Sequence, residues 1–214
     1  MDRRGASVKG TRAYDGTGRQ ERARRQLDVT LDAALALFLD EGYRAITVEA
    51  IAGAAGISAA TIYKSYGGKS GLVRRLCTRA LEGVGPVPAE ERSNALRTAS
   101  DPRQLVEGWG RLTAEVSPRV SPIMLLLRTA GATDPEAAAL YDELDAARLR
   151  RMTANARSLA AAGHLGAGVT TRDARDVLWL CSSPELYDLL IRRRRWSLTK
   201  FQRFVTETMV SALL

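Results

Sequence analysis

The sequence has few residues that bind metals or form crosslinks. It contains two cysteines, Cys77 and Cys181, and one histidine, His164. A zinc finger needs four Cys or His ligands at short spacing, so that class is excluded. A disulfide framework is not expected either, because the two cysteines lie about a hundred residues apart, and a reducing compartment fits. We therefore expect each cysteine to be a small buried apolar residue.

Long hydrophobic runs and catalytic signatures are also missing. No run of 18 or more apolar residues is present, so no membrane span is expected. The charged N-terminus has no apolar core behind it, which argues against a secretory signal and favours a cytoplasmic protein. The sequence contains no recognisable catalytic triad, metal-ligand set, P-loop or dinucleotide fingerprint. We expect no cofactor and no enzymatic activity.

Positive charge is abundant. The 214 residues carry a formal net charge of +8, and the sequence pI is about 10.0. Such a balance indicates a polyanionic partner, which is a nucleic acid, an anionic membrane surface or an acidic ligand. Residues 1–19 mix Gly, Ser, Thr and basic residues and predict a flexible basic arm. Either the arm contacts DNA through Arg3, Arg4, Lys9 and Arg12, or it is a solvated tail.

Helical periodicity begins near Glu21. Apolar residues recur on one face of the first predicted helix, at Leu27, Leu31, Ala34 and Phe38. Gly42 ends this helix, Thr47 caps a second helix, and Ser58 caps a third that runs to Tyr66. No segment alternates with a period of two over the length of a strand. The fold class is therefore all-α.

The remaining helices are longer. We predict them over 70–83, 102–116, 119–130, 135–162, 171–192 and 198–213, with breaks at Gly- and Pro-rich stretches. The predicted organisation is a basic arm over 1–19, a three-helix unit over 20–69 and a larger helical domain over 70–214.

The stretch TVEAIAGAAGISAATIYKSY has the spacing of a helix-turn-helix. Gly56 suits the tight turn, where a positive φ is costly for other residues. With Ile57 and Ile62 pointing into the core, the outer face of the last helix carries Ala59, Ala60, Thr61 and Lys64. Small outward side chains allow such a helix to enter the major groove of DNA. We expect the Tyr63 hydroxyl and the Lys69 ammonium to contact phosphates, and Tyr66 to lie mainly in the core.

The segment LDAALALFLDEGYRAITVEAIAGAAGISAATIYKSYGGKSGLV resembles the DNA-binding domain of TetR-family transcriptional regulators. The resemblance runs from about Arg25 to Val73 without a gap. It implies phosphate contacts from Thr47, Tyr63 and Lys69, and base contacts at or near Thr61. The implied DNA-binding set is Thr47, Ser58, Ala59, Ala60, Thr61, Tyr63, Lys64 and Lys69. Glycines 67, 68 and 71 depart from the family pattern, which leaves open how rigidly the recognition helix is coupled to the next one.

The resemblance also implies a C-terminal domain that binds a small effector and forms the dimer. Apolar stripes on the last two predicted helices suit pairing across a two-fold axis, although packing within the chain would bury them equally well. The first stripe consists of Val177, Leu178 and Cys181, and the second of Phe201, Val205, Met209 and Leu213. Candidate effector-pocket residues, which are otherwise ordinary core, are Trp109, Met124, Leu127, Arg128, Tyr141 and Trp179.

The sequence thus predicts a ligand-responsive DNA-binding transcriptional regulator. We expect a repressor that binds a near-palindromic operator as a homodimer and is released by a small effector. Two alternatives stay open at this point. One is a sequence-nonspecific polyanion or membrane-surface binder, and the other is an enzyme that uses the helix-turn-helix as a packing unit.

Overall fold

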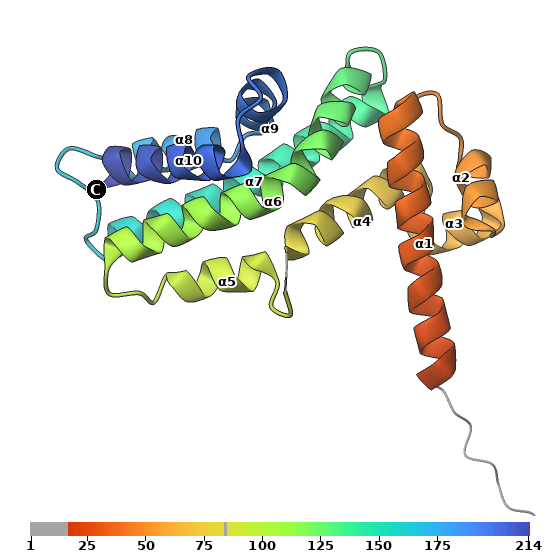
Figure 1. Cartoon of the computed structure of the whole chain (residues 1–214), viewed down its shortest axis with the longest axis horizontal. Coiled ribbons are helices and arrows are strands. Elements are labelled where there is room, and N and C mark those ends of the chain that lie inside the picture. Colours follow the sequence, from red (N-terminus) through yellow and green to blue (C-terminus); the bar gives the residue numbers. More distant parts are fainter. Residues whose placement is uncertain (1–16, 84) are drawn as a thin grey trace, which may run out of the picture.

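The computed structural model describes residues 17–83 and 85–214, and it contains helices and no strand within those ranges (Figure 1). The predicted all-α class is confirmed. The four basic residues proposed for the arm, Arg3, Arg4, Lys9 and Arg12, lie outside the described residues. The first helix begins at Thr17, slightly before the predicted end of the arm.

Three helices form a compact unit, which we call the head. They are α1 (Thr17–Glu41), α2 (Val48–Ala55) and α3 (Ala59–Tyr66). Local sequence fixes their ends: the Thr47 hydroxyl accepts a hydrogen bond from the N–H of Ala50, and Gly56 ends α2 with φ of 66°. The head core is built around fully buried side chains that include Phe38, Ile51 and Ile62.

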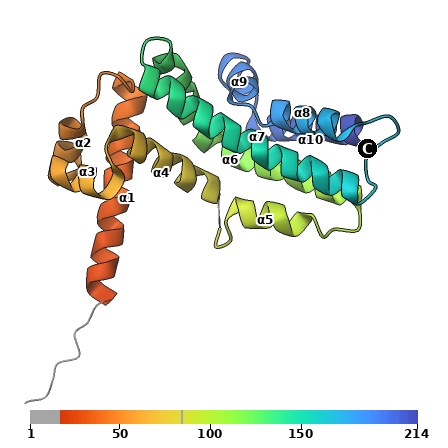
Figure 2. The same cartoon turned by 180° about the vertical axis from the view of Figure 1, so that it is seen from behind.

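The first half of α1 differs from its prediction. Leu27 was expected on the buried face, yet its side chain is 41% exposed. In Figures 1 and 2 the beginning of α1 extends past α2 and α3, so this part of the helix has few neighbours. Leu31, Ala34 and Phe38 are buried as predicted.

The rest of the chain, residues 69–214, is called the body. It contains α4 (Lys69–Glu82), α5 (Ala89–Leu96), α6 (Pro102–Gly131), α7 (Pro135–Ala161), α8 (Thr171–Cys181), α9 (Pro184–Tyr187), the π-helical segment η1 (Asp188–Arg193) and α10 (Leu198–Leu213). The long helices α6 and α7 pack against each other; α10 packs on α6 and α8 on α7 (Figure 1). Helix α5 lies along the other side of α6.

Three sequence-based helix predictions were wrong. A break was predicted between 116 and 119, but Pro118 and Pro122 lie inside the continuous helix α6. A proline in a helix interior removes a backbone hydrogen bond, and here the packing of α6 against α7, α9 and α10 offsets that loss. The predicted helix 171–192 stops at Cys181, because Ser183 caps a new helix that begins at Pro184. Helix α5 was missed because its sequence has little apolar periodicity.

The apolar stripe of α10 is part of the body core. Phe201, Val205, Met209 and Leu213 are almost completely inaccessible within a single chain, and they pack with Leu178, Cys181 and Trp109. The prediction that this stripe pairs across a two-fold axis is therefore wrong, since α6 and α8 already bury it. In the part of the chain that the structure describes, no helix combines the length and hydropathy that a bilayer span requires.

Candidate nucleic-acid interface

Helix α3 is held firmly at both ends. The hydroxyl of Ser58 accepts a hydrogen bond from the N–H of Thr61, and Gly67 ends the helix with φ of 75°. Ile62 is completely buried and fastens one face of α3 to the head core. The opposite face is therefore presented to solvent in a fixed orientation, as a helix that enters a groove requires.

The exposed face of α3 carries short polar and basic side chains. Ala60, Thr61 and Lys64 are exposed, as predicted, and Ser58 lies exposed at the start of the helix. The hydroxyls of Ser58 and Thr61 share a hydrogen bond of 2.8 Å, which orients both. Ala59 was predicted on the outer face of α3, but it is only half-exposed because it packs against the head core.

The two tyrosines of α3 have different environments. Tyr63 is 54% exposed, and its ring lies beside the backbone of Gly68. Tyr66 packs against the head core, and its hydroxyl is buried without a hydrogen-bond partner. Burial raises the pKa of Tyr66, so its phenol stays neutral. This arrangement agrees with an outward role for Tyr63 and a packing role for Tyr66.

Lys69 is the first residue of α4, and its side chain contacts the head. Its Nζ donates a hydrogen bond of 3.0 Å to the carbonyl oxygen of Tyr43 and lies 4.6 Å from the centre of the Tyr43 ring. An ammonium group has three donors, so two stay available for a phosphate. The Thr47 side chain is also exposed, while its hydroxyl caps α2.

The glycines after α3 join it closely to α4. A Cβ at Gly71 would lie 1.5 Å from the carbonyl oxygen of Tyr66, so only glycine permits this approach. Gly68, with φ of 106°, is in a conformation that other residues rarely adopt. The departure from the family pattern therefore corresponds to a tight contact between the two helices.

The structure shows a hydrogen bond between α1 and α2 that the sequence did not predict. The side-chain amide of Gln26 donates a 2.9 Å hydrogen bond to the carbonyl oxygen of Ala55, at the end of α2. This bond links the first half of α1 to the helix-turn-helix. Glutamine on a helix surface has no distinctive spacing, so the sequence offered no signal for it.

The predicted effector residues do not form one pocket. Leu127 of α6 packs in the core cluster that joins the head to α4, α6 and α7, whereas Trp109 packs in the second core cluster of the body and donates its indole N–H to the carbonyl oxygen of Ser93. Trp179 lies under the guanidinium of Arg148. Met124, the fourth of these candidate residues, is also buried.

Two of the six candidates share a polar partner. Arg128 and the hydroxyl of Tyr141 both donate to Glu185 on α9, at 2.7 and 3.1 Å. Burial, followed by the charge of Glu185, raises the pKa of Tyr141 to about 12. Arg128, Tyr141 and Glu185 thus satisfy one another's hydrogen-bonding groups.

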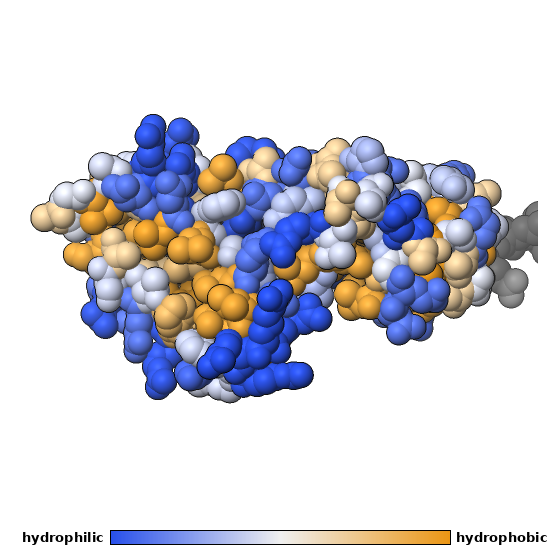
Figure 3. Space-filling model, turned by 90° about the horizontal axis from the view of Figure 1, so that it is seen from above, coloured by the Kyte–Doolittle hydropathy of each residue, from blue (hydrophilic) through white to orange (hydrophobic). Residues whose placement is uncertain are grey.

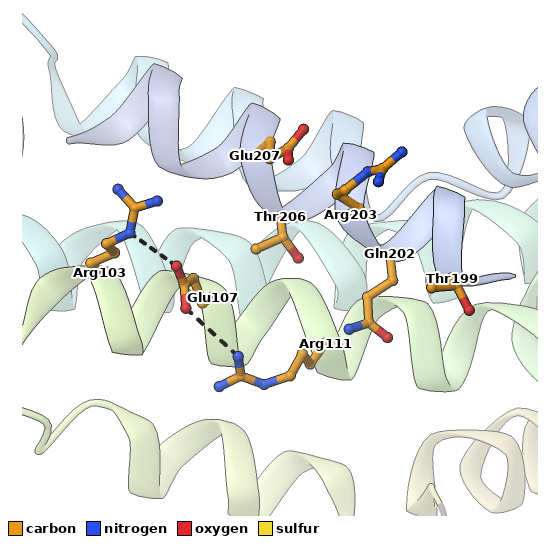
Figure 4. Close-up of a pocket in the computed structure, with 8 residues that line it drawn as sticks. All are labelled: Arg103, Glu107, Arg111, Thr199, Gln202, Arg203, Thr206 and Glu207. Atoms are coloured by element: carbon orange, nitrogen blue, oxygen red, sulfur yellow. Dashed lines mark hydrogen bonds and ion pairs between the residues drawn. The ribbon is translucent and has the colours of Figure 1, made fainter.

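Two cavities lie elsewhere and are lined by none of those six residues. One, of about 310 Å³, is an open groove between α6 and α10 (Figure 4). Arg103 and Arg111 of α6 both pair there with Glu107, at 3.0 and 3.8 Å, while Arg203 of α10 points away from them. The second cavity lies between the head and the body. Among the described residues, no group of three or more His, Cys, Asp or Glu side chains could hold a metal ion.

Helices α2 and α3, the tight turn between them and the exposed face of α3 define a helix-turn-helix unit within an all-helical fold. The sequence profile of the family "Bacterial regulatory proteins, tetR family" matches residues 31–76. The helix-turn-helix segment of this chain is therefore similar to that of the TetR family of bacterial regulatory proteins. This match agrees with the expectation of a transcriptional regulator for the segment that it covers.

A curated relative agrees with this assignment over the same region. YvkB of Bacillus subtilis (strain 168), an uncharacterised HTH-type transcriptional regulator, is 40% identical over 57 residues. The match covers 27% of this chain and spans only 30% of the length of YvkB.

Solved structures extend the likeness to the body. NalD, the secondary repressor of the MexAB-OprM multidrug efflux pump in Pseudomonas aeruginosa, has a TM-score of 0.69 at 21% identity, over 91% of this chain and 98% of that one. SmeT in complex with triclosan has a TM-score of 0.69 at 19% identity, over 89% and 92%. FadR from Bacillus subtilis in complex with stearoyl-CoA has a TM-score of 0.67 at 17% identity, over 89% and 100%. At such identities these likenesses establish the fold.

Proposed function

We propose that the protein is a ligand-responsive repressor that binds a near-palindromic DNA operator as a homodimer and is released by a small effector. The observation that carries the proposal is the exposed face of α3, where Thr61 and Lys64 are available for base edges and Tyr63 for phosphate. Because a transcriptional regulator acts where the DNA is, we also propose a cytoplasmic location.

A dimer is part of the proposal because one head has too few contacts. Each good bidentate base contact gives about 1–3 kcal/mol of discrimination, and a single short helix makes few of them. Two heads linked in one dimer combine their contacts, because the second binds at high effective concentration. They would read half-sites one DNA turn, about 34–36 Å, apart.

The outer faces of α8 and α10 are the proposed dimer interface. Leu180 is 57% exposed and Phe204 38% exposed, and Val177 is only half-buried. Figure 3 looks onto the side of the molecule that carries α8 and α10, and apolar residues gather there between charged ones. Burying such a face against its own copy would remove about 25 cal/mol of unfavourable exposure per Å².

Sedimentation tests the dimer. We expect Leu180→Glu with Phe204→Glu to give a helical monomer that loses operator binding. The control is Leu81→Glu, at a position of similar exposure on α4, which should stay dimeric. A wild-type protein that is monomeric at micromolar concentration and still binds a single half-site specifically would refute this interface.

Operator selection tests DNA recognition. Genomic fragments bound by the full chain should share one sequence, and scrambled duplexes should bind far more weakly at matched salt. A nonspecific polyanion binder would instead hold all fragments equally and bind anionic vesicles as well. Equal binding would overturn the regulator and support that alternative.

The last part of the proposed function is the release of the protein from DNA by a small-molecule effector. SmeT and FadR, which share this fold, were solved with triclosan and with stearoyl-CoA. We propose that residues 70–214 receive an effector, that 20–69 bind DNA, and that 1–19 form a basic arm. The Arg128–Tyr141 pair, with its partner Glu185, is the part of the predicted pocket set that this proposal retains. An effector shifts the heads only as far as its affinities for the two states differ.

A further inference from the structure

Three helices that belong to different parts of the molecule enclose a cavity. Helix α1 of the head and helices α4 and α6 of the body surround a space of about 210 Å³. Its lining residues are Leu35, Leu39, Leu76, Arg79, Ala80, Pro118, Arg119, Pro122 and Ile123. In Figures 1 and 2, α4 lies between α1 and α6, so the cavity lies at the junction where the head joins the body.

The walls of this cavity are apolar. Leu76 and Ile123 are buried at its base, and Leu39, which is 50% exposed, stands at its mouth. Pro118 and Pro122 are one helical turn apart and present two rings on the same face of α6. An exposed leucine beside a hollow of this kind gains from contact with an apolar ligand.

The polar groups of the cavity are both cationic. None of the nine lining residues is acidic, while Arg79 and Arg119 are both among them. The guanidinium of Arg79 pairs at 2.8 Å with Asp32, on the same face of α1 as Leu35 and Leu39.

Arg119 is less well satisfied. Its Nη2 lies 3.4 Å from the carbonyl oxygen of Glu115 and 3.8 Å from its carboxylate, both long for a charged pair. Its Nε is buried and has no hydrogen-bond partner. The Arg119 side chain is still 35% exposed, so the accessible part of its guanidinium can donate a charge-assisted hydrogen bond to a carboxylate oxygen in the cavity.

We infer that this cavity binds a small carboxylate with a compact apolar body. The carboxylate pairs with Arg119, and the apolar body packs between Leu35 of α1 and Ile123 of α6. A volume of about 210 Å³ holds roughly seven waters at about 30 Å³ each, which suits a molecule the size of benzoate or hexanoate rather than a drug-sized ligand.

Occupancy of the cavity also controls the head, and this second part rests on the proposed function. A ligand that contacts both α1 and α6 fixes their separation, and α1 contributes to the core that holds α3. The prolines of α6 favour adjustment at this place, because neither can donate the N–H bond that would hold the preceding turn. Coupling free energies between two sites correspond to about 5- to 150-fold in affinity. We expect saturating ligand to weaken operator binding by at least about fivefold.

Direct binding is measured first, on the full chain without DNA. Calorimetry and ligand-observed NMR use benzoate and hexanoate, with benzamide and hexanamide as uncharged partners of the same shape. Both carboxylates should bind the wild type, and both amides should bind at least about tenfold more weakly, since they lack the charge-assisted pair. Failure of both carboxylates to bind, or equal binding of the amides, overturns the site.

Three variants locate the bound molecule. Arg119→Met should abolish carboxylate binding, while Arg111→Met, an arginine of the same helix outside the cavity, should bind as the wild type does. Leu39→Trp fills the mouth from an exposed position and should also abolish binding while Arg119 is retained. Each variant is first checked for wild-type helix content and melting temperature. Carboxylate binding that survives in both cavity variants refutes the assignment.

The two parts fail in different ways. If the free protein selects an operator but binds neither carboxylate, the cavity site is wrong and the regulator stands. If benzoate binds and no operator is selected, the proposed function is wrong and the cavity site stands. If both bind independently of each other, the coupling between the cavity and the head is refuted.

Discussion

Replacing Gly71 with alanine should separate α3 from α4. An added Cβ would lie 1.5 Å from the Tyr66 carbonyl oxygen and 2.6 Å from its carbon, far inside the 3.4 Å at which ordinary contact begins. The colliding atoms are backbone, so no side-chain rotation relieves the collision. Forced overpacking costs about 1–3 kcal/mol, and the better helix propensity of alanine returns less than about 1 kcal/mol. We therefore expect Gly71→Ala to lower the free energy of unfolding by about 2 kcal/mol.

A second glycine provides the matched control. Gly53 lies on the exposed side of α2, and a Cβ there would meet nothing within 4 Å. Gly53→Ala should therefore raise the free energy of unfolding by about 0.5–1 kcal/mol. Urea unfolding followed by circular dichroism compares the two variants with the wild type. Equal stability of Gly71→Ala and Gly53→Ala would refute the close contact between α3 and α4.

The other predictions concern DNA contacts and one buried phenol. Tyr63→Phe and Lys69→Ala should weaken binding to all DNA sequences by a similar factor, and Lys69→Ala should also reduce the salt slope by about one unit; a loss confined to one sequence would contradict phosphate roles. Exchanging Thr61 or Lys64 should change the consensus obtained by operator selection, and an unchanged consensus would move base reading elsewhere. Tyr43→Phe should be neutral or stabilising at pH 7, because the Tyr43 hydroxyl is buried without a partner. Burial, followed by the charges of two nearby carboxylates, raises the pKa of Tyr43 from 10.0 to about 12. The folded state therefore favours the neutral phenol, and this contribution is complete below pH 10 and is lost as the pH rises towards 12. Between pH 9 and 11 the wild type should lose about 1 kcal/mol relative to Tyr43→Phe in urea unfolding, and parallel pH profiles would refute the shift.

Much of the head could be predicted because its determinants are local. A cap such as Thr47 or Ser58 acts within one turn of helix. Gly56 adopts the left-handed backbone conformation that ends α2, and this depends only on its own position. The outward direction of Thr61 and Lys64 follows once Ile62 is assigned to the core, since the helical period fixes the rest. For these reasons the helix-turn-helix and its exposed face were predicted correctly.

The effector site could not be predicted in the same way. Six residues were chosen for their type and helical spacing, but the structure places Leu127 and Trp109 in different core clusters and Trp179 against Arg148. Periodicity indicates that a side chain is buried, but it does not identify the side chains that surround it. A cavity is defined by several elements at once, and Leu35, Arg79 and Arg119 meet at one cavity although they lie far apart in the sequence.

The sequence alone thus determined the all-α class, the caps and the orientation of the recognition helix, because each depends on hydrogen bonds and periodicity within a few residues. Only the tertiary structure decided that α6 continues through Pro118 and Pro122, since its packing against neighbouring helices offsets the backbone hydrogen bonds that the two prolines remove. It also decided that the α10 stripe at Val205 and Met209 packs inside one chain. An apolar stripe must be buried, but whether the same chain or a second copy buries it depends on how distant helices are arranged in space.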